Sequence, residues 1–215
     1  DQDETYSYFK GRLSSYKNKE KVSWRYEYNT RDQLIATIDP YQQRTSYSYT
    51  KQGLIASVTR PGNKKQSYRW GKNGELESIT DPQGHTRKLH YSDWGQVVAS
   101  ELRLKGNILA GITYFEYNAT GKLIQIKTPD GKSTNYFYND NDQLTQQCDP
   151  NGRVTAFEYD GLSQVVKRIN PNGDALSYEY DKERNLTALI NENSERYQFA
   201  YDGNERLIKE MGFDG

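Results

Sequence analysis

A ring, any residue, and a second ring recur along the chain at a fixed spacing. The pairs are Tyr26/Tyr28, Tyr47/Tyr49, Tyr68/Trp70, Phe115/Tyr117, Tyr136/Tyr138, Phe157/Tyr159, Tyr178/Tyr180 and Phe199/Tyr201. Leu89/Tyr91 fills the one gap in the series, and Tyr6/Tyr8 precedes it. From Tyr28 onward the second ring recurs in steps of 21 residues, with a single step of 26. A fixed period of this length is the signature of a repeat architecture.

Two further positions follow the same period. The aliphatic residues that lie six positions after the second ring are Leu34, Leu76, Val97, Leu123, Leu144, Val165, Leu186 and Leu207, while Leu54 lies at five. A Pro-x-Gly turn comes next, as in Asp149-Pro150-Asn151-Gly152 and Asn170-Pro171-Asn172-Gly173. The repeat therefore reads Tyr-x-Tyr-Asp/Asn-x-x-Gly/Asn-x-Leu, five residues, then Pro-x-Gly.

This pattern predicts one β-hairpin per repeat. Residues i and i+2 of a strand share a face, so Tyr136 and Tyr138 lie on one side and Phe137 on the other. Proline fixes φ at one turn and glycine supplies the positive φ after it, while the polar segment 139–143 makes the second turn. Two turns in each repeat leave two strands of about six residues. We therefore expect an all-β fold of tandem 21-residue β-hairpin repeats in a long curved antiparallel sheet.

We predict residues 1–215 to be a single array of about nine to ten repeats. The step of 26 predicts a longer hairpin at 92–116, which is either a docking site or a tolerated insertion. The array is expected to be truncated at both ends, because Asp1 is not a natural start and the last repeat stops at Gly215.

A lone hairpin is marginal in water, so stability should come from contacts between neighbouring repeats. We expect the rings to form the ladder that holds the hairpins together, through cross-strand aromatic pairs. The predicted structural repeat positions are Tyr26, Tyr28, Tyr47, Tyr49, Tyr136, Tyr138, Tyr159, Tyr178, Tyr180, Tyr201, Leu34, Leu76, Leu123, Leu144, Leu186 and Leu207.

The composition is consistent with a folded chain that has no net electrostatic attraction to a charged partner. Lys+Arg and Asp+Glu are both 29, so the net charge is zero and nucleic acid is not an expected partner. Leu, Ile, Val and Phe make up about 18% of the residues, a low fraction, and the 19 tyrosines supply the missing apolar area. No apolar run reaches the length of a membrane span, and no signal peptide opens the chain.

Candidate chemistry is sparse. His85 and His90 are the two histidines, and in a strand they would face opposite sides. Cys148 takes the place that Ile38 and Ile169 hold in their repeats, so a buried thiol is expected. Aspartates such as Asp160 are explained better by turn chemistry than by cation binding. We predict no catalytic, cofactor-binding or metal-binding residue, no cofactor, and no enzyme activity.

The motif Tyr-x-Tyr-Asp with Gly-Arg-Leu nearby resembles the YD repeat. Tyr8-Phe9-Lys10-Gly11-Arg12-Leu13, Tyr159-Asp160-Gly161 and Tyr180-Asp181 carry it. The chain is similar over essentially its whole length to the repeat region of bacterial Rhs proteins, insecticidal toxin-complex subunits, wall-associated proteins and teneurins. The resemblance implies an open fragment of a YD/Rhs shell that encloses a C-terminal toxin or similar cargo in a bacterial secreted polymorphic toxin. The expected partners are then further repeats, a core domain and the toxin of the same parent chain.

The alternative is a binding module in which the Tyr-rich sheet grips cell-surface carbohydrate or a receptor. Exposed rings can stack on sugars, whereas rings locked to the strand period are more simply explained as a ladder. Secretion, or delivery to the extracellular side by a bacterial secretion system, is the expected localisation.

Overall fold

The computed structural model describes residues 4–214, where every regular element is a β-strand. No helix occurs among these residues, so the chain there has no helix long and apolar enough to cross a membrane. Tyrosine, phenylalanine and β-branched residues favour a pleated, half-buried surface, and a turn follows each strand before a helix could extend. The predicted all-β fold of antiparallel hairpin repeats is confirmed.

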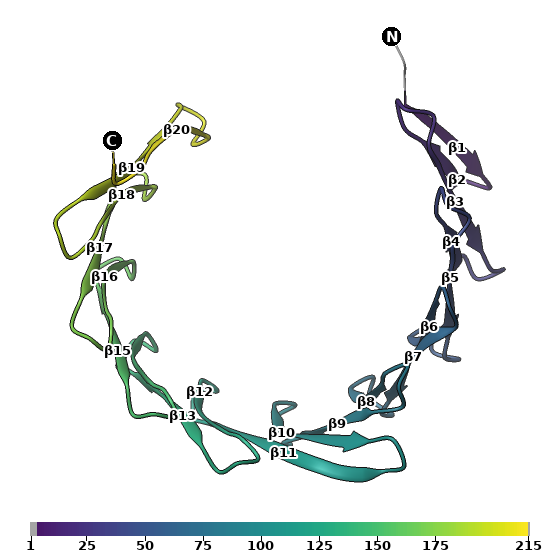
Figure 1. The fold of residues 1–215 in the computed structure, drawn as a ribbon, viewed down its shortest axis with the longest axis horizontal. Helices are drawn as coiled ribbons and strands as arrows, with labels where there is room; N and C mark the ends of the chain where they lie inside the picture. Colours follow the sequence, from purple (N-terminus) through teal and green to yellow (C-terminus); the bar gives the residue numbers. More distant parts are fainter. Residues whose placement is uncertain (1–3, 215) are drawn as a thin grey trace. The chain divides into compact units, whose positions relative to one another are not determined.

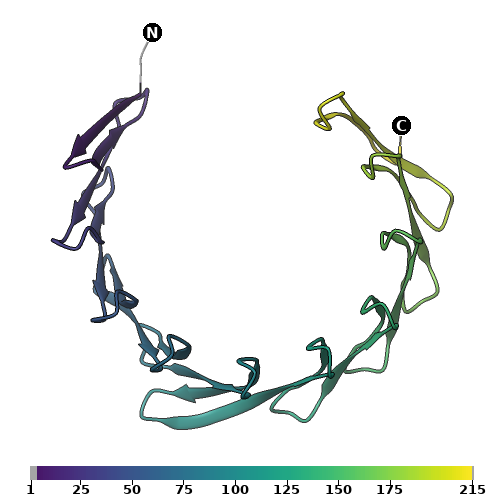
Figure 2. The same ribbon diagram turned by 180° about the vertical axis from the view of Figure 1, so that it is seen from behind.

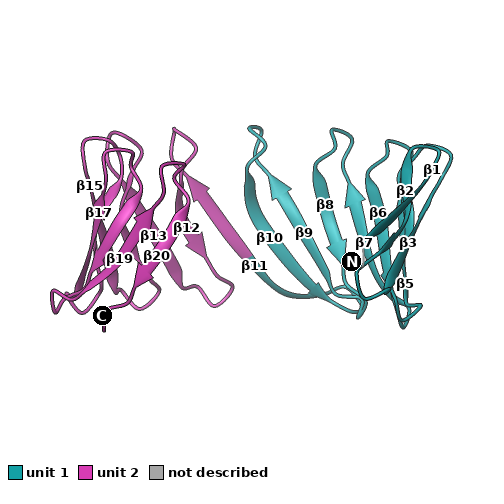
Figure 3. Cartoon of the chain, turned by 90° about the horizontal axis from the view of Figure 1, so that it is seen from above, with its two compact units in different colours: residues 1–112 teal, residues 113–215 magenta. Residues whose placement is uncertain are grey.

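The chain divides into two compact units, residues 1–112 and residues 113–215 (Figure 3). The border falls inside the strand β11 (Ile108–Tyr117). The strands of the first unit that precede β11 are β1 (Thr5–Phe9), β2 (Arg12–Lys17), β3 (Ser23–Tyr28), β4 (Leu34–Ile38), β5 (Arg44–Tyr49), β6 (Ile55–Arg60), β7 (Lys64–Trp70), β8 (Leu76–Thr80), β9 (Thr86–Tyr91) and β10 (Val97–Leu104).

The second unit contains the end of β11 and nine further strands. These are β12 (Leu123–Lys127), β13 (Ser133–Tyr138), β14 (Leu144–Cys148), β15 (Val154–Tyr159), β16 (Val165–Ile169), β17 (Ala175–Tyr180), β18 (Leu186–Ile190), β19 (Arg196–Tyr201) and β20 (Leu207–Met211). Within each unit the strands follow one another in chain order as a meander (Figures 1 and 2).

Two kinds of antiparallel pairing alternate within each unit. In the first kind, a ring-bearing strand pairs with the next strand with a bulge, over four positions as β13 does with β14, or over more positions as β1 does with β2 and β9 with β10. In the second kind, pairing covers three positions, as between β14 and β15, or four as between β6 and β7. Two strands that pair in the second way therefore separate toward the end of the ring-bearing strand where the second ring lies. This alternation sets where neighbouring repeats need an additional link.

Most turns of the repeats share one geometry, and those at 61–63 and 105–107 differ from it. At Asp160 the backbone N–H donates to the Gln164 oxygen at 2.9 Å, and the Ser163 N–H donates to the Asp160 oxygen at 3.2 Å. The Asp160 carboxylate accepts the N–H groups of Leu162 and Gln164, both at 2.9 Å. Ser163 has a φ of 68°, so the turn is a type I turn closed by a left-handed residue. The Asp-Pro turn at Asp149 repeats these bonds.

The sheet is a single layer without an enclosed core. Among residues 4–214 the buried hydrophobic side chains are Ala36, Val58, Ala99 and Ala188. The chain exposes 14891 Å², whereas a compact monomer of 25.0 kDa would expose about 10,000 Å². Stability must therefore come from contacts between adjacent strands rather than from a packed interior.

The repeat interval of 26 residues contains the two longest strands, β10 with 8 residues and β11 with 10. Its turn is closed by the Asn107 N–H, which donates to the Leu104 oxygen at 3.0 Å. The expected truncation of the array at Asp1 and at Gly215 concerns positions that lie outside the described residues.

Candidate functional site

The second ring of the repeat forms a hydrogen bond to the backbone of the preceding repeat. In each case the ring N–H or O–H donates to the main-chain oxygen of the residue 15 positions earlier. The bonds run from Tyr28 to Leu13 (3.1 Å), Tyr49 to Leu34 (2.7 Å), Trp70 to Ile55 (2.7 Å), Tyr91 to Leu76 (2.9 Å), Tyr138 to Leu123 (2.9 Å), Tyr159 to Leu144 (2.8 Å), Tyr180 to Val165 (2.8 Å) and Tyr201 to Leu186 (2.9 Å). We call these the ring-to-carbonyl bonds.

Each ring-to-carbonyl bond lies where two strands part. The pairing of β14 with β15 covers Gln146 to Cys148 on β14 and stops there. Beyond Gln146 the Tyr159 hydroxyl reaches the Leu144 oxygen across the widening gap. A buried backbone carbonyl without a donor costs free energy, so the phenol both satisfies that oxygen and fixes the distance between repeats.

The aliphatic position of the repeat is the acceptor of these bonds. Leu34, Leu76, Leu123, Leu144 and Leu186 each begin a strand and accept a ring through their main-chain oxygen. The sixth predicted leucine, Leu207, begins β20. In the one repeat where the sequence placed Leu54 at this position, the structure places Ile55 there instead, six residues after Tyr49 and bonded to Trp70. Leu54 belongs to the turn.

Burial favours the neutral form of four of the bonding hydroxyls. Desolvation raises the pKa values of Tyr49, Tyr138, Tyr159 and Tyr180 above the ordinary tyrosine value. A neutral phenol is a hydrogen-bond donor, whereas a phenolate is not. The raised pKa values of these four tyrosines therefore favour the donor form that their bonds require.

The first ring of each pair has a different environment. Tyr26, Tyr47, Tyr136 and Tyr178 are half-buried on the same face as the second rings. Their cross-strand neighbours are not rings; Tyr136 lies opposite Gln147 and Tyr178 opposite Leu189. Within residues 4–214 the Tyr178 hydroxyl forms no hydrogen bond with another protein group. The first ring contributes packing area, whereas the second ring contributes a polar link.

Ring-to-ring contacts are concentrated in two places. Tyr16 lies 5.0 Å from Tyr6 and 5.3 Å from Trp24 between ring centroids in the first unit. Tyr197 lies 5.0 Å from Phe199 and 5.6 Å from Phe213 in the second unit. The expected ladder of cross-strand aromatic pairs is thus largely replaced by ring-to-carbonyl bonds. The reason is register: in the other repeats the paired positions place rings such as Tyr136 and Tyr178 opposite an aliphatic or polar residue.

The opposite face carries charged pairs between strands of neighbouring repeats. Arg44 donates two hydrogen bonds of 2.7 Å to the Glu27 carboxylate, and Arg196 contacts Glu179 in the same bidentate way. The hydrogen bond from Arg44 lowers the pKa of Glu27, and that from Arg196 lowers the pKa of Glu179. Both pairs are solvent-accessible, so each contributes little to the free energy of unfolding. Their main effect is to favour the observed register of the strands.

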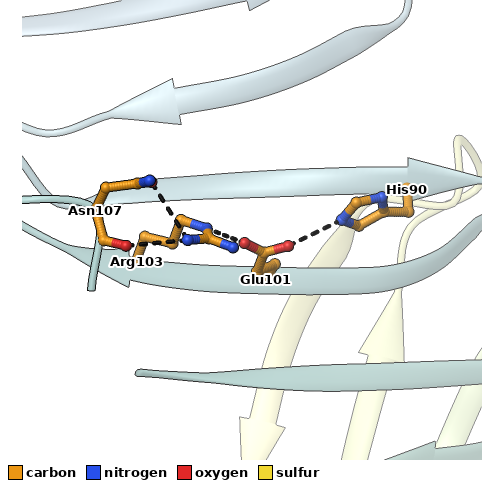
Figure 4. Close-up of polar contacts among 4 residues, drawn as sticks. All are labelled: His90, Glu101, Arg103 and Asn107. Carbon is orange, nitrogen blue, oxygen red and sulfur yellow. Dashed lines mark hydrogen bonds and ion pairs between the residues drawn. The ribbon is translucent and has the colours of Figure 1, made fainter. Parts of the chain in front are cut away.

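A chain of polar contacts runs from β9 along β10 to the turn that follows β10 (Figure 4). Glu101 contacts Arg103 through one carboxylate oxygen and His90 Nε2 at 3.4 Å through the other. Arg103 donates to the Asn107 main-chain oxygen at 3.0 Å. Glu101 is only 8% exposed, because neighbouring side chains of the single layer cover it. The hydrogen bond from Arg103 lowers the pKa of Glu101, which keeps the carboxylate charged.

The remaining candidate residues do not converge. His85 lies in a turn with its Nδ1 3.1 Å from the Asp81 carboxylate, apart from His90. Cys148 is half-buried rather than buried, because the single layer has no interior to enclose the thiol. Within residues 4–214 no group of three or more His, Cys, Asp or Glu side chains could hold a metal ion. The expectation that the chain has no catalytic or cofactor-binding residue stays a prediction.

Shallow grooves lie beside the parting strands. One, of about 410 Å³, is lined by residues that include Phe9, Arg12, Tyr26 and Tyr28. A second, of about 400 Å³, is lined by Glu116, Asn118, Ile124, Gln125, Asn135, Tyr136, Phe137 and Tyr138. Each groove therefore places aromatic rings beside polar side chains.

Comparison with sequence families supports the resemblance drawn from the motif. Residues 138–175 match the sequence family described as RHS Repeat. Residues 138–175 therefore carry an Rhs repeat. The matched segment contains Tyr138, Tyr159 and the acceptor Leu144, so the ring-to-carbonyl bond lies within a recognised Rhs repeat. No curated protein sequence matches the chain.

Solved structures with the same fold are parts of Tc toxins. A crystal structure of TcdB2-TccC3-TEV matches with a TM-score of 0.69 at 15% identity, over 93% of this chain and 12% of that one. TcdB2-TccC3 without its hypervariable C-terminal region matches with the same values. A Photorhabdus luminescens Tc holotoxin pore with a mutated TccC3 matches with a TM-score of 0.70 at 14% identity, over 94% and 12%. This chain thus spans about an eighth of the length of those chains.

Proposed function

We propose that this chain is a wall segment of an Rhs/YD-type shell that encapsulates a C-terminal toxin or similar cargo in a secreted polymorphic toxin. Its role is structural, and its partners are further repeats, a core domain and the toxin of the same parent chain. The ring-to-carbonyl bond, recurring at the same offset in eight repeats, is the observation that carries the proposal.

A wall has to be continuous, thin and independent of a core. The single-layer sheet has these properties, because each repeat is held by its neighbours through strand pairing and one ring. Stability that depends on nearest neighbours permits an array of any length, which enclosure of a cargo requires. The Rhs-repeat match and the fold shared with Tc toxin structures support this interpretation.

The two faces of the sheet suit a wall that separates different surroundings. Half-buried rings line one face, and the charged pairs Glu27–Arg44 and Glu179–Arg196 line the other. A zero net charge avoids the self-repulsion that a long array of like-charged repeats would accumulate. We further propose that the parent chain is secreted or delivered to the extracellular side by a bacterial secretion system.

Imaging tests the proposal. The parent chain that contains this array would be expressed and examined by single-particle electron microscopy. We expect a sheet wound around a cavity, with density for cargo inside and protection of that cargo from added protease. A solid particle without a cavity, or cargo cleaved as fast as in the isolated state, would contradict a wall function.

The second candidate is carbohydrate binding. The groove of about 400 Å³ favours it, because Tyr136 and Tyr138 lie there beside the amides of Gln125 and Asn135. Against it, the Tyr138 hydroxyl is engaged by the Leu123 oxygen, and Gln125 and Asn135 bond to each other at 2.8 Å. A glycan array probed with the purified chain separates the candidates, since the absence of binding to any sugar would eliminate this one.

A further inference from the structure

The two faces of the sheet differ in charge within residues 113–214. Side chains alternate between the faces of a strand, so the cross-strand pairs assign each paired position to one face. We call the face that carries both rings of each pair the ring-bearing face, and the opposite one the charged face. At the paired positions of β12 to β20 the charged residues of the ring-bearing face are Arg168 and Glu210. Those of the charged face are Lys127, Glu158, Lys167, Glu179, Arg196 and Lys209.

The ring-bearing face is a contiguous apolar surface. Tyr178 pairs with Leu189, Leu189 pairs with Tyr197, and Phe199 follows on the same face of β19. All four side chains are half-buried, so each leaves part of its apolar area uncovered. Within residues 113–214 the strands belong to one sheet, and no second layer covers this face. Soluble proteins rarely leave large contiguous apolar surfaces in water, so we expect the ring-bearing face to meet a partner.

The first rings add hydrogen-bonding capacity that the sheet does not use. The hydroxyls of Tyr136 and Tyr178 form no hydrogen bond with another group of residues 4–214, whereas those of Tyr138 and Tyr180 donate to main-chain oxygens. A neutral hydroxyl can both donate and accept. Backbone N–H and C=O groups offer the matching acceptor and donor along almost any polypeptide. The ring-bearing face therefore fits a polypeptide chain whatever its sequence.

We propose that the ring-bearing face lines the cavity of the shell and contacts the enclosed polypeptide through its rings and free hydroxyls, independently of the sequence of that polypeptide. This inference rests on the wall function proposed above. A wall has one inner and one outer face, and charged side chains are the ones that proteins keep in water, so the charged face is the outer one. With Arg168 and Glu210 as its charged residues, the ring-bearing face does not select cargo of one charge sign.

Two neighbouring glutamines of β14 form a matched pair for testing which face is inside. Gln146 pairs with Phe137 on the charged face, and Gln147 pairs with Tyr136 on the ring-bearing face. Gln146→Cys and Gln147→Cys would be introduced separately into the parent chain, each together with Cys148→Ser. The reagent is a maleimide carried by a polyethylene glycol chain too large to cross a closed sheet. The Cys148→Ser parent supplies the background, and the parent unfolded in urea supplies the reactivity of each thiol without the wall.

The pattern of modification identifies the outer face. In the folded parent we expect Gln146→Cys to be modified and Gln147→Cys to lose modification, while both react alike after unfolding. Modification of Gln147→Cys with protection of Gln146→Cys would place the charged face inside and overturn the inference. Equal modification of both thiols in the folded parent would overturn it as well. Because Gln147 is itself half-buried, a second readout that does not depend on access is needed.

Photocrosslinking in the parent chain supplies that readout and identifies the occupant. Tyr178→p-benzoylphenylalanine places the photoreactive group on the ring-bearing face of β17, and Glu179→p-benzoylphenylalanine places it one residue away on the charged face. We expect irradiation to join the first variant to the cargo and to yield no such product with the second. The same result with a cargo of different sequence is expected, since the contact does not depend on sequence.

The outcomes separate this inference from the wall function on which it rests. In particles that electron microscopy shows to hold cargo, crosslinks to the cargo from position 179, or none from position 178, would overturn the inference and leave the wall function intact. A crosslink from position 178 to a second copy of the chain instead of the cargo would also overturn it. A parent particle without a cavity would refute the wall function, and the inference with it.

Discussion

Removing one hydroxyl from the second ring should destabilise the array, whereas removing one from the first ring should not. Tyr178 and Tyr180 lie on the same face of the strand β17. They differ in whether the hydroxyl forms a hydrogen bond. Tyr180 donates to the Val165 oxygen at 2.8 Å, while the Tyr178 hydroxyl bonds to no other group in the described chain. Tyr180→Phe and Tyr178→Phe therefore form a matched pair that deletes the same atom.

The magnitude follows from the environment of the bond. A net protein hydrogen bond contributes about 1 kcal/mol, and an orphaned buried carbonyl would add to that cost. In a single layer water can reach the released Val165 oxygen, so we expect the loss for Tyr180→Phe to stay near 1 kcal/mol. With a urea m value of roughly 2 kcal/mol/M, the unfolding midpoint would fall by about 0.5 M.

Urea unfolding followed by far-ultraviolet circular dichroism is the assay. Tyr178→Phe should leave the midpoint within about 0.1 M of the parent. Replacing Tyr138, Tyr159, Tyr180 and Tyr201 together should lower stability by about 4 kcal/mol, a large part of what a domain of this size has. Equal shifts for Tyr178→Phe and Tyr180→Phe would show that ring packing, not the hydrogen bond, joins the repeats.

Three further predictions concern the turns and the charged face. Asp160→Ala should cost about 1 kcal/mol in urea unfolding, because the carboxylate accepts two backbone N–H groups, and Asp160→Asn should restore most of it. Ser163→Gly should stabilise the array by about 0.5 kcal/mol, since it relieves the strain of a φ of 68°. Gly152→Ala, at a φ of 78° with open space around it, should destabilise the array by about 1 kcal/mol. A destabilising Ser163→Gly together with a stabilising Gly152→Ala would refute backbone strain as the cause. The pKa of Glu179 is lower in the folded state than in the unfolded state, where it is near 4.3. The stability that this difference adds is present above the unfolded pKa and is lost as the pH falls through the folded pKa. The urea midpoints of the parent and of Arg196→Gln should therefore differ at neutral pH and converge in acid.

Much of the fold follows from the sequence because strand and turn signals are local. Alternating rings at Tyr136 and Tyr138 predict a strand with one apolar face, and β13 (Ser133–Tyr138) contains both rings. Asp-Pro-Asn-Gly at Asp149 predicts a turn with a left-handed glycine, and Gly152 has a φ of 78°. Each prediction depended only on the backbone preferences of neighbouring residues, which the tertiary structure of this chain keeps.

The link between repeats could not be predicted in the same way. The acceptor of the Tyr159 hydroxyl is a main-chain oxygen 15 residues earlier, and every residue has such an oxygen. Only the parting of β14 from β15 selects that atom, and parting is a property of the pairing between strands. The period did carry a trace of the link, because the second ring and the aliphatic position keep a constant offset. Trp70 shows that the second-ring position does not require a tyrosine. It requires an aromatic ring that carries a hydrogen-bond donor, here the indole N–H that donates to the Ile55 oxygen.

The dependence of stability on the number of repeats tests the central claim most directly. Arrays of increasing length cut from residues 113–215 would be unfolded in urea, once with tyrosine and once with phenylalanine at every second-ring position. A nearest-neighbour analysis separates the free energy of one repeat from the coupling between repeats. We expect phenylalanine to weaken the coupling by about 1 kcal/mol per interface and to leave the intrinsic term unchanged. An unchanged coupling with a lower intrinsic term would contradict the account, because the ring would then stabilise its own hairpin instead of joining it to the one before.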